Sequence, residues 1–141
     1  MIKVIAGGRK SRGWVLDGVS EYEKRLSKYW ALEWRFVNDD AVDSAVAKLD
    51  ARDFVVVMDE RGANLSSPEL SAKLNGAIES GRQIVIVVGG AYGVNDATRE
   101  RADLIWSLSK LVFPHELVRV LLAEQVYRAQ EIANGGKYHH A

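Results

Sequence analysis

Two short runs of uninterrupted apolar residues place the strongest constraint on how this chain can fold. Phe54-Val55-Val56-Val57-Met58 lies within the predicted strand Asp53–Asp59, and Gln83–Val88 contains a second such run. A strand that is apolar on both faces is typical of a parallel sheet covered by helices on each side, because a half-exposed strand alternates apolar and polar residues. The two runs therefore predict the centre of a parallel sheet.

The segments around these runs alternate between strand-like and helical patterns. Ile2–Ala6 is another apolar run, and Ala31–Val37 alternates apolar and polar side chains as a half-exposed strand does. The remaining predicted elements are a strand at Asp103–Leu108 and helices at Trp14–Lys28, Asp40–Ala51, Ser67–Ser80 (with Ser67 as its cap), Val94–Arg101 and Pro114–Asn134. This order predicts an α/β fold, with a mostly parallel sheet, helices on both of its faces and a single domain over residues 1–141.

The composition excludes several classes of protein. The 141 residues include no cysteine, so disulfides, thiolate zinc sites and cysteine nucleophiles are excluded. The 19 basic and 19 acidic residues balance, so binding to nucleic acid would have to depend on a local patch. Three histidines, with no clustered acids beyond Asp59-Glu60, do not indicate a metal site. No apolar run is long enough for a membrane span and no signal peptide is recognisable, so we expect a cytoplasmic protein.

The carboxyl ends of the predicted strands carry the candidate binding loops, which are Met58–Gly62, Gly89–Gly93 and Leu108–Phe113. In open α/β sheets ligands bind beyond these ends, and glycines let a ligand approach the backbone closely. Tight turns explain the same glycines without any ligand. Gly89-Gly90-x-x-Gly93 is not a dinucleotide fingerprint and the chain has no P-loop, so both of those nucleotide sites are disfavoured.

The last predicted helix carries a mixed row of side chains. The apolar residues Leu117 and Leu121 are continued along the helix by Glu124 and Arg128, an acid followed by a base four residues later. This pattern favours a protein interface with a polar patch beside it, and a solvated surface pair is the alternative.

A basic loop and the chain terminus are two further candidates. Arg9, Lys10 and Arg12 can bind RNA phosphates, with Trp14 stacked on a base. The alternatives are a solvated loop and a Trp14 that starts the core face of its helix. At the terminus, Tyr138 and His139 offer donors, acceptors and a group that titrates near neutral pH.

Together these motifs resemble one family. Met58-Asp59-Glu60-Arg61-Gly62 is similar to its L-D-x-x-G motif, and Ile86–Gly93 is similar to its F-x-I-G-G-x-x-G motif. Leu104–Ala129 matches the family's longest signature, and Tyr138-His139 matches its terminal pair. On these motifs, the chain resembles the RlmH family of SPOUT methyltransferases over essentially its full length.

The resemblance implies a trefoil knot at the C-terminal end of the sheet, dimerisation through that knot and S-adenosylmethionine as cofactor. The implied reaction is methylation of N3 of a pseudouridine in large-subunit ribosomal RNA, which makes the rRNA or the ribosome a partner. The positions that match the family's cofactor site are Met58, Gly89, Leu108, Ser109, Lys110, Leu111, Val112 and Phe113.

The resemblance also suggests catalytic roles. His139 is the candidate general base, because N3 of pseudouridine must lose its proton and an imidazole titrates near neutral pH. Tyr138 would orient the target base, and Arg128, oriented by Glu124, would hold a phosphate or stabilise negative charge on the base. Arg119 is expected either to act as Arg128 does or to be structural. A composite site, with the tail of one subunit over the cofactor of the other, fits the interface-like helix.

The chain departs from the family pattern in two places, and two alternative functions stay open. The stretch from Val37 to Phe54 is shorter than in many relatives, and His140 stands where relatives often have a basic residue. A non-catalytic RNA-binding or ribosome-binding α/β domain would share the basic loop. A nucleotide-dependent enzyme of another class, such as an oxidoreductase, would share the α/β pattern but not the Leu108–His115 signature.

Overall fold

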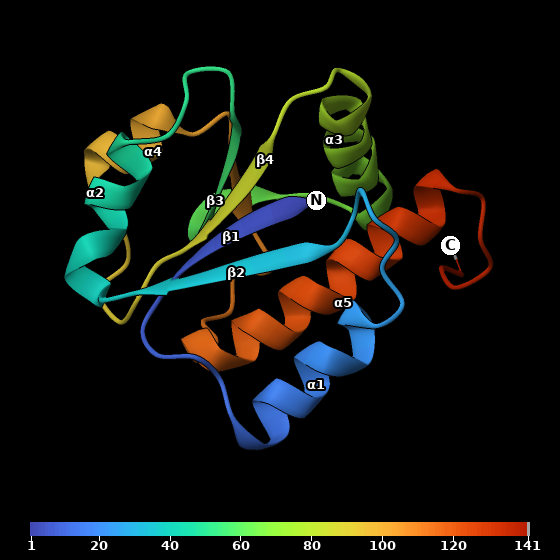
Figure 1. Ribbon diagram of the computed structural model, residues 1–141, viewed down its shortest axis with the longest axis horizontal. Helices are drawn as coiled ribbons and strands as arrows, with labels where there is room; N and C mark the ends of the chain where they lie inside the picture. The colour runs from blue at the N-terminus through green and yellow to red at the C-terminus, as the bar shows by residue number, and fades with distance from the viewer. Residues whose placement is uncertain (141) are drawn as a thin grey trace.

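The structure is a computed structural model that describes residues 1–140, and it is built on one five-stranded sheet (Figure 1). The strands are β1 (Ile2–Gly7), β2 (Leu32–Val37), β3 (Phe54–Asn64), β4 (Ile84–Val88) and β5 (Leu104–Ser107). They are ordered β2-β1-β4-β3-β5, and all four neighbouring pairs are parallel. The parallel sheet predicted from the apolar runs is therefore confirmed.

Helices cover both faces of the sheet, as Figure 1 shows. On one face lie α1 (Gly13–Glu23), α3 (Ser67–Glu79) and α5 (His115–Ala133). On the other lie α2 (Val42–Ala47), which follows the short 3-10 turn η1 (Asp39–Ala41), and α4 (Asp96–Arg101). Among the residues that the structure describes, no helix combines the length and the apolar character that crossing a membrane requires.

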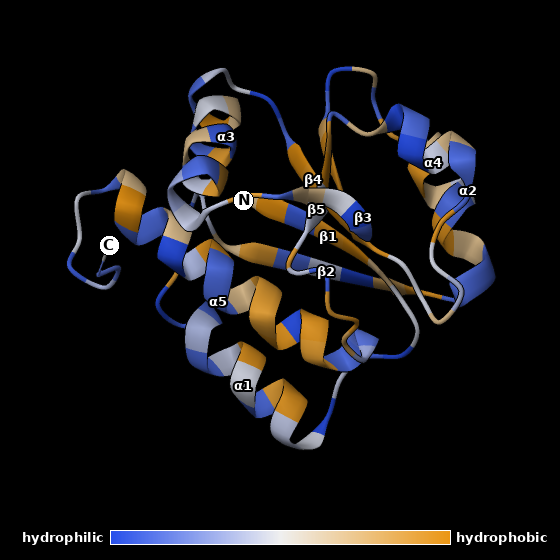
Figure 2. Ribbon diagram, turned by 180° about the vertical axis from the view of Figure 1, so that it is seen from behind, coloured by the Kyte–Doolittle hydropathy of each residue, from blue (hydrophilic) through white to orange (hydrophobic). Residues whose placement is uncertain are grey.

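The position of β4 at the centre of the sheet explains why its sequence is apolar without interruption. Its residues alternate between the two hydrophobic clusters: Ile84, Ile86 and Val88 pack under α1, α3 and α5, whereas Val85 and Val87 pack under α2 and α4. All five are buried, and β4 is correspondingly orange in Figure 2. Because apolar burial stabilises in proportion to the area removed from water, this two-sided core holds the carboxyl ends of the strands in place.

Two helices begin or end at other residues than the sequence pattern predicts. We predicted a helix up to Lys28, but α1 ends at Glu23, and the amide N–H of Ser27 instead donates to the Gln130 Oε1 atom of α5 over 2.7 Å. We predicted Ser67 as the cap of the third helix, but the cap is Ser66, whose side chain forms a capping box with Glu69.

Trp14 does not belong to the core. Its side chain is 67% exposed, whereas its neighbour Val15 is buried. The interpretation of Trp14 as the start of the core face is therefore wrong, because α1 is oriented so that Val15 and Val19 are its buried residues.

Strand β3 runs past the point where the apolar run ends. Its pairing with β5 jumps between Met58 and Ala63, so residues 59–62 bulge out of the sheet. A Cβ atom at Gly62 would lie 2.5 Å from the carbonyl oxygen of Ile105, so only glycine allows this close approach. The bulge places charged side chains at the carboxyl edge of the sheet. A knotted path of the chain in this region stays a prediction.

Candidate active site

A cavity of about 710 Å³ lies at the carboxyl edge of the sheet, where β3, β4 and β5 end. Its volume is in the range of small-molecule and cofactor sites. Seven of the eight residues predicted to contact a cofactor line it, namely Met58, Gly89, Leu108, Ser109, Leu111, Val112 and Phe113. Lys110 lies in the same loop but is exposed and is not among the lining residues.

The wall of the cavity after β4 consists mainly of backbone. Gly90 and Gly93 close a tight turn, in which the amide N–H of Gly93 donates to the carbonyl oxygen of Gly90 over 3.1 Å. Gly93 has a φ of 72°, which favours glycine. A Cβ atom at Gly89 would lie 3.1 Å from the Cα atom of Gly93, so a larger residue would push the turn outward. The glycines of this wall present amide and carbonyl groups to a ligand, beside the side chain of Tyr92.

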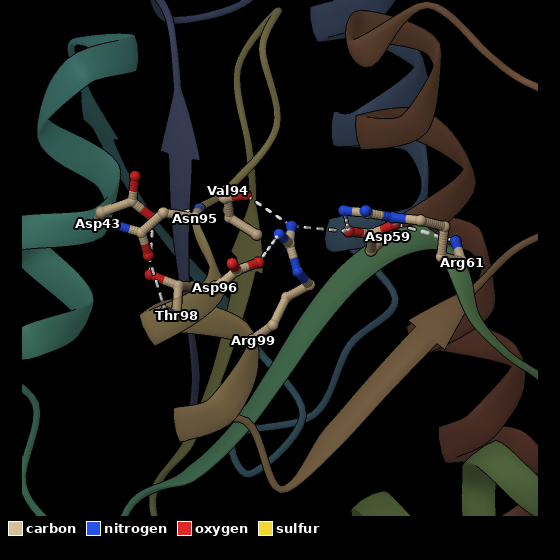
Figure 3. A network of polar contacts seen from close by, with 8 residues as sticks. All are labelled: Asp43, Asp59, Arg61, Val94, Asn95, Asp96, Thr98 and Arg99. Atoms are coloured by element: carbon tan, nitrogen blue, oxygen red, sulfur yellow. Dashed lines mark hydrogen bonds and ion pairs between the residues drawn. The ribbon is translucent and has the colours of Figure 1, made fainter.

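An ion-pair network joins two walls of the cavity (Figure 3). Asp59, on the β3 bulge, accepts hydrogen bonds from Arg61 Nε at 3.1 Å and Nη2 at 3.0 Å. Arg99 of α4 lies 3.6 Å from Asp59 Oδ2, donates to the carbonyl oxygen of Val94 over 2.6 Å and pairs with Asp96. Arg99 therefore connects the Gly89–Gly93 wall, which we call the glycine wall, to the bulge of β3.

The start of α4, which follows the Gly89–Gly93 wall, is also anchored to α2. Asp43 Oδ1 accepts hydrogen bonds from the amide N–H of Asn95 at 3.0 Å and from Thr98 Oγ1 at 2.7 Å (Figure 3). Asn95 in turn caps α4 through its side chain, which accepts from the Thr98 amide N–H. The start of α4 is thus held from two sides, which fixes the end of the glycine wall.

The ionisation of Asp59 makes the stability of the folded protein depend on pH. The hydrogen bond from Arg61 lowers the pKa of Asp59, assisted by the charges of Arg61 and Arg99 and opposed by burial. A carboxyl whose pKa is lowered by folding contributes stability above its unfolded pKa and loses that contribution as the pH falls through its folded pKa. We expect Asp59→Asn to flatten the acid limb of stability, so that its urea midpoint falls less than that of the wild type between pH 7 and about pH 3. An equal fall in both proteins would contradict this role.

The predicted catalytic residues form a second cluster at the carboxyl end of α5. Glu124 Oε2 accepts hydrogen bonds from Arg128 Nη2 at 2.7 Å and from the Tyr138 hydroxyl at 2.8 Å. Arg128 Nη1 lies 3.0 Å from His139 Nδ1, and its guanidinium stacks over the Tyr138 ring at 4.7 Å. The terminal segment therefore folds back onto α5 through Glu124 and Arg128, which we call the tail cluster together with Tyr138 and His139.

These contacts determine the proton positions in the tail cluster. An arginine has no acceptor, so Arg128 must donate to an unprotonated Nδ1, and the proton of the neutral His139 ring lies on Nε2. Burial, together with the hydrogen bond to Glu124, raises the pKa of the Tyr138 phenol well above its usual range. Tyr138 therefore stays protonated and acts as a donor.

The tail cluster lies further along α5 than the cavity. His115 and Val118, in the first turn of this helix, line the cavity, but no member of the tail cluster does so. The ten residues from Val118 to Arg128 span about 15 Å at the rise of an α-helix. Figure 1 likewise places the C-terminus at the far end of α5 from the loop that precedes it. Within one chain, the structure brings together the residues predicted to contact the cofactor, and it brings together the tail residues, but the tail cluster forms no part of the cavity lining.

Arg119 is structural and shapes the basic loop. Its side chain is 1% exposed and donates to the carbonyl oxygens of Gly7 and Arg9, at 3.1 and 2.8 Å, and to Ser11 Oγ at 2.7 Å. Arg9, Lys10 and Arg12, the predicted RNA-binding residues, are exposed around this anchor. The loop starts beside the cavity, because a Cβ atom at Gly7 would lie 2.7 Å from the amide nitrogen of Gly90.

Sequence reasoning assigned no role to Arg99 or His115, although both belong to the cavity region. For His115 a signal existed, because it directly follows a loop at the carboxyl end of a strand and opens a helix. For Arg99 no local pattern distinguishes it from a surface arginine. Among residues 1–140 no group of three or more histidine, aspartate or glutamate side chains is placed to hold a metal ion.

Fold and site define the class of protein: an α/β protein with a parallel sheet and a cofactor-sized cavity at its carboxyl edge. A family model described as "Predicted SPOUT methyltransferase" matches residues 1–139. The chain therefore belongs to the SPOUT methyltransferase family, as the motif resemblance indicated.

Curated relatives match over nearly their whole length. A protein of Thioalkalivibrio sulfidiphilus is 42% identical over 152 residues, which cover 98% of this chain and 97% of the relative. A protein of Methylobacillus flagellatus is 38% identical over 151 residues with the same coverage, and one of Geobacter metallireducens is 38% identical over 152 residues with 99% of each chain covered. Each of the three is named Ribosomal RNA large subunit methyltransferase H.

Proposed function

We propose that this protein uses S-adenosylmethionine to methylate N3 of a pseudouridine in large-subunit ribosomal RNA, as one SPOUT domain over residues 1–141. The observation that carries the proposal is the cavity, lined by matching cofactor positions, in a chain whose relatives are named for methylation of this rRNA. The deciding experiment is transfer of radiolabelled methyl from S-adenosylmethionine to ribosomes that lack the modification. No label in intact ribosomes or in free rRNA would leave a non-catalytic RNA-binding domain.

The cavity fits S-adenosylmethionine in both volume and chemistry. Apolar side chains of Leu108, Val112 and Phe113 suit an adenine ring, and backbone groups of the Gly89–Gly93 wall can hydrogen-bond its edge. The Asp59–Arg61 pair at the rim supplies both charges, which suits an amino acid group carrying an ammonium and a carboxylate. When bound there, the cofactor supplies an electrophilic methyl group.

Cofactor binding is testable without any RNA. S-adenosylhomocysteine at one hundred times its dissociation constant is expected to stabilise the protein by about 2.7 kcal/mol, because a ligand that binds only the native state shifts unfolding by mass action. Thermal unfolding with and without the ligand measures this shift. NAD is the control and should leave the melting temperature unchanged. Stabilisation by NAD but not by S-adenosylhomocysteine would contradict the proposed cofactor.

We assign the removal of the N3 proton to His139. Nδ1 is the unprotonated nitrogen of the ring, and Arg128 donates to it in the substrate-free protein. When the target base enters, Arg128 would turn to the carbonyl oxygens beside N3, where it stabilises the negative charge left by deprotonation, and Nδ1 would accept the proton. Glu124 and Tyr138 position the Arg128 guanidinium, which in turn contacts the His139 ring.

The separation of the tail cluster from the cavity supports a homodimer with composite active sites. No member of the tail cluster lines the cavity of its own chain, and Arg128 lies about 15 Å of helix beyond Val118, the last residue of α5 that does. A second copy would bring its tail cluster to this cavity. The exposed side chains of Trp14, Leu111 and Val112, which are 67%, 68% and 76% accessible, are apolar surface of the kind that a partner covers.

A further inference from the structure

A second cleft, which shares no residue with the cofactor cavity, lies between α1 and the edge strand β2. It has a volume of about 380 Å³ and is lined by Lys10, Ser11, Leu16, Val19, Glu23, Trp34 and Phe36. We call it the edge cleft. Its lining is mostly apolar, yet it carries a cation at one end and a carboxylate at the other.

Trp34 and Phe36 contribute aromatic rings to one wall of the edge cleft. The rings of Trp34 and Phe36 stack with 5.8 Å between their centroids and an interplanar angle of 5°. The indole N–H of Trp34 is buried and forms no hydrogen bond of normal geometry. Burial raises the pKa of the Glu23 carboxyl, and the neighbouring indole N–H partly offsets this effect. The Glu23 carboxylate therefore lies beside the indole N–H and is one of the polar groups that line the cleft.

The basic loop connects the edge cleft to the cofactor cavity. Lys10 and Ser11 line the cleft, while Gly7, at the other end of the loop, contacts the Gly90 turn of the cavity. Arg119 lies between the two sites: it anchors this loop and also stacks over Phe36, with its guanidinium 5.0 Å from the ring centroid. One strand of RNA that follows the loop would therefore pass both sites.

We infer that the edge cleft binds an unpaired nucleotide of the RNA substrate, next to the nucleotide that is methylated. This inference rests on the proposed function. A nucleobase stacks on the indole of Trp34, and its donors face Glu23. The phosphate lies at Lys10, with Arg9 and Arg12 beside it. A peptide or a second copy of the chain would match the apolar lining but would not account for the three exposed cations at its rim.

Filling the edge cleft tests the inference. Leu16 lies on its rim and is 36% exposed, so Leu16→Trp adds an indole to the cleft without removing core packing. We expect the KM for RNA to rise between about fivefold and one hundredfold, the range that corresponds to one lost base stack, while kcat and S-adenosylhomocysteine binding stay unchanged. Ala72→Trp, at an exposed position of α3, is the matched control and should leave the KM unchanged.

A second measurement does not depend on any variant. RNA carrying 4-thiouridine beside the target nucleotide, irradiated on the wild-type protein, should crosslink to Trp34 or Phe36, as mapped by mass spectrometry. Crosslinks confined to the cofactor cavity, or an unchanged KM for Leu16→Trp, would overturn the inference. A dimer that dissociates on Leu16→Trp, measured by sedimentation, would assign the cleft to a second copy instead. Failure of the wild type to methylate RNA would overturn the proposed function itself.

Discussion

Replacing His139 with alanine is expected to lower methyl transfer by about 10²–10⁴-fold, the usual contribution of a positioned general base, while S-adenosylhomocysteine binds as it does to the wild type. The two effects separate because His139 lies in the tail cluster and lines no part of the cofactor cavity of its own chain. Single-turnover transfer of labelled methyl to rRNA measures the first effect, and thermal stabilisation by the ligand measures the second.

His140→Ala is the matched control for this variant. His140 is the adjacent residue and carries the same side chain, but it is exposed and is not part of the tail cluster. It should keep transfer close to the wild-type rate. A His139→Ala protein with normal turnover would remove His139 from the role of base, and parallel loss in both variants would indicate a general requirement for a basic tail.

Two inactive variants are expected to restore activity when they are mixed. His139→Ala lacks the base, and Gly89→Val displaces the glycine wall, because a Cβ atom there already lies 3.1 Å from Gly93. In a heterodimer with composite sites, one of the two sites receives an intact tail and an intact cavity. Random exchange of subunits makes half of the dimers mixed, so about one quarter of the wild-type activity should return.

The measurement is methyl transfer by each variant alone and by their mixture, after subunit exchange at a concentration where sedimentation confirms the dimer. Combining both substitutions in one chain supplies the control, since its mixture with His139→Ala contains no site with an intact tail. Activity of the mixture equal to the sum of the separate variants would contradict the composite site. A monomer at micromolar concentration would do the same.

Much of the fold follows from local patterns in the chain. Uninterrupted apolar runs such as Ile84–Val88 predict central parallel strands, because both faces of these strands have to be covered. Parallel strands end at the same edge of a sheet, so the order of strands and loops along the chain is enough to group the three loops at their carboxyl ends into one site. The cavity confirms this grouping, with Lys110 outside its lining.

Other features depend on contacts between distant segments. The early end of α1 depends on Gln130, which lies 103 residues after Ser27. The role of Arg119 depends on three acceptors in a loop more than 100 residues away, and no periodic pattern in the sequence predicts these contacts. The exposure of Trp14 depends on the phase of α1 against the sheet, which buries Val15 and Val19 instead.

The sequence by itself determined the α/β class, the parallel sheet and the positions of its binding loops, because apolar periodicity and glycine placement act over a few neighbouring residues. Only the tertiary structure decided that the tail folds back onto α5 outside the cavity of its own chain and that Arg119 anchors the basic loop. The edge cleft between α1 and β2 likewise exists only in the folded chain. These features arise from the packing of segments far apart in sequence, whose relative positions no local pattern specifies.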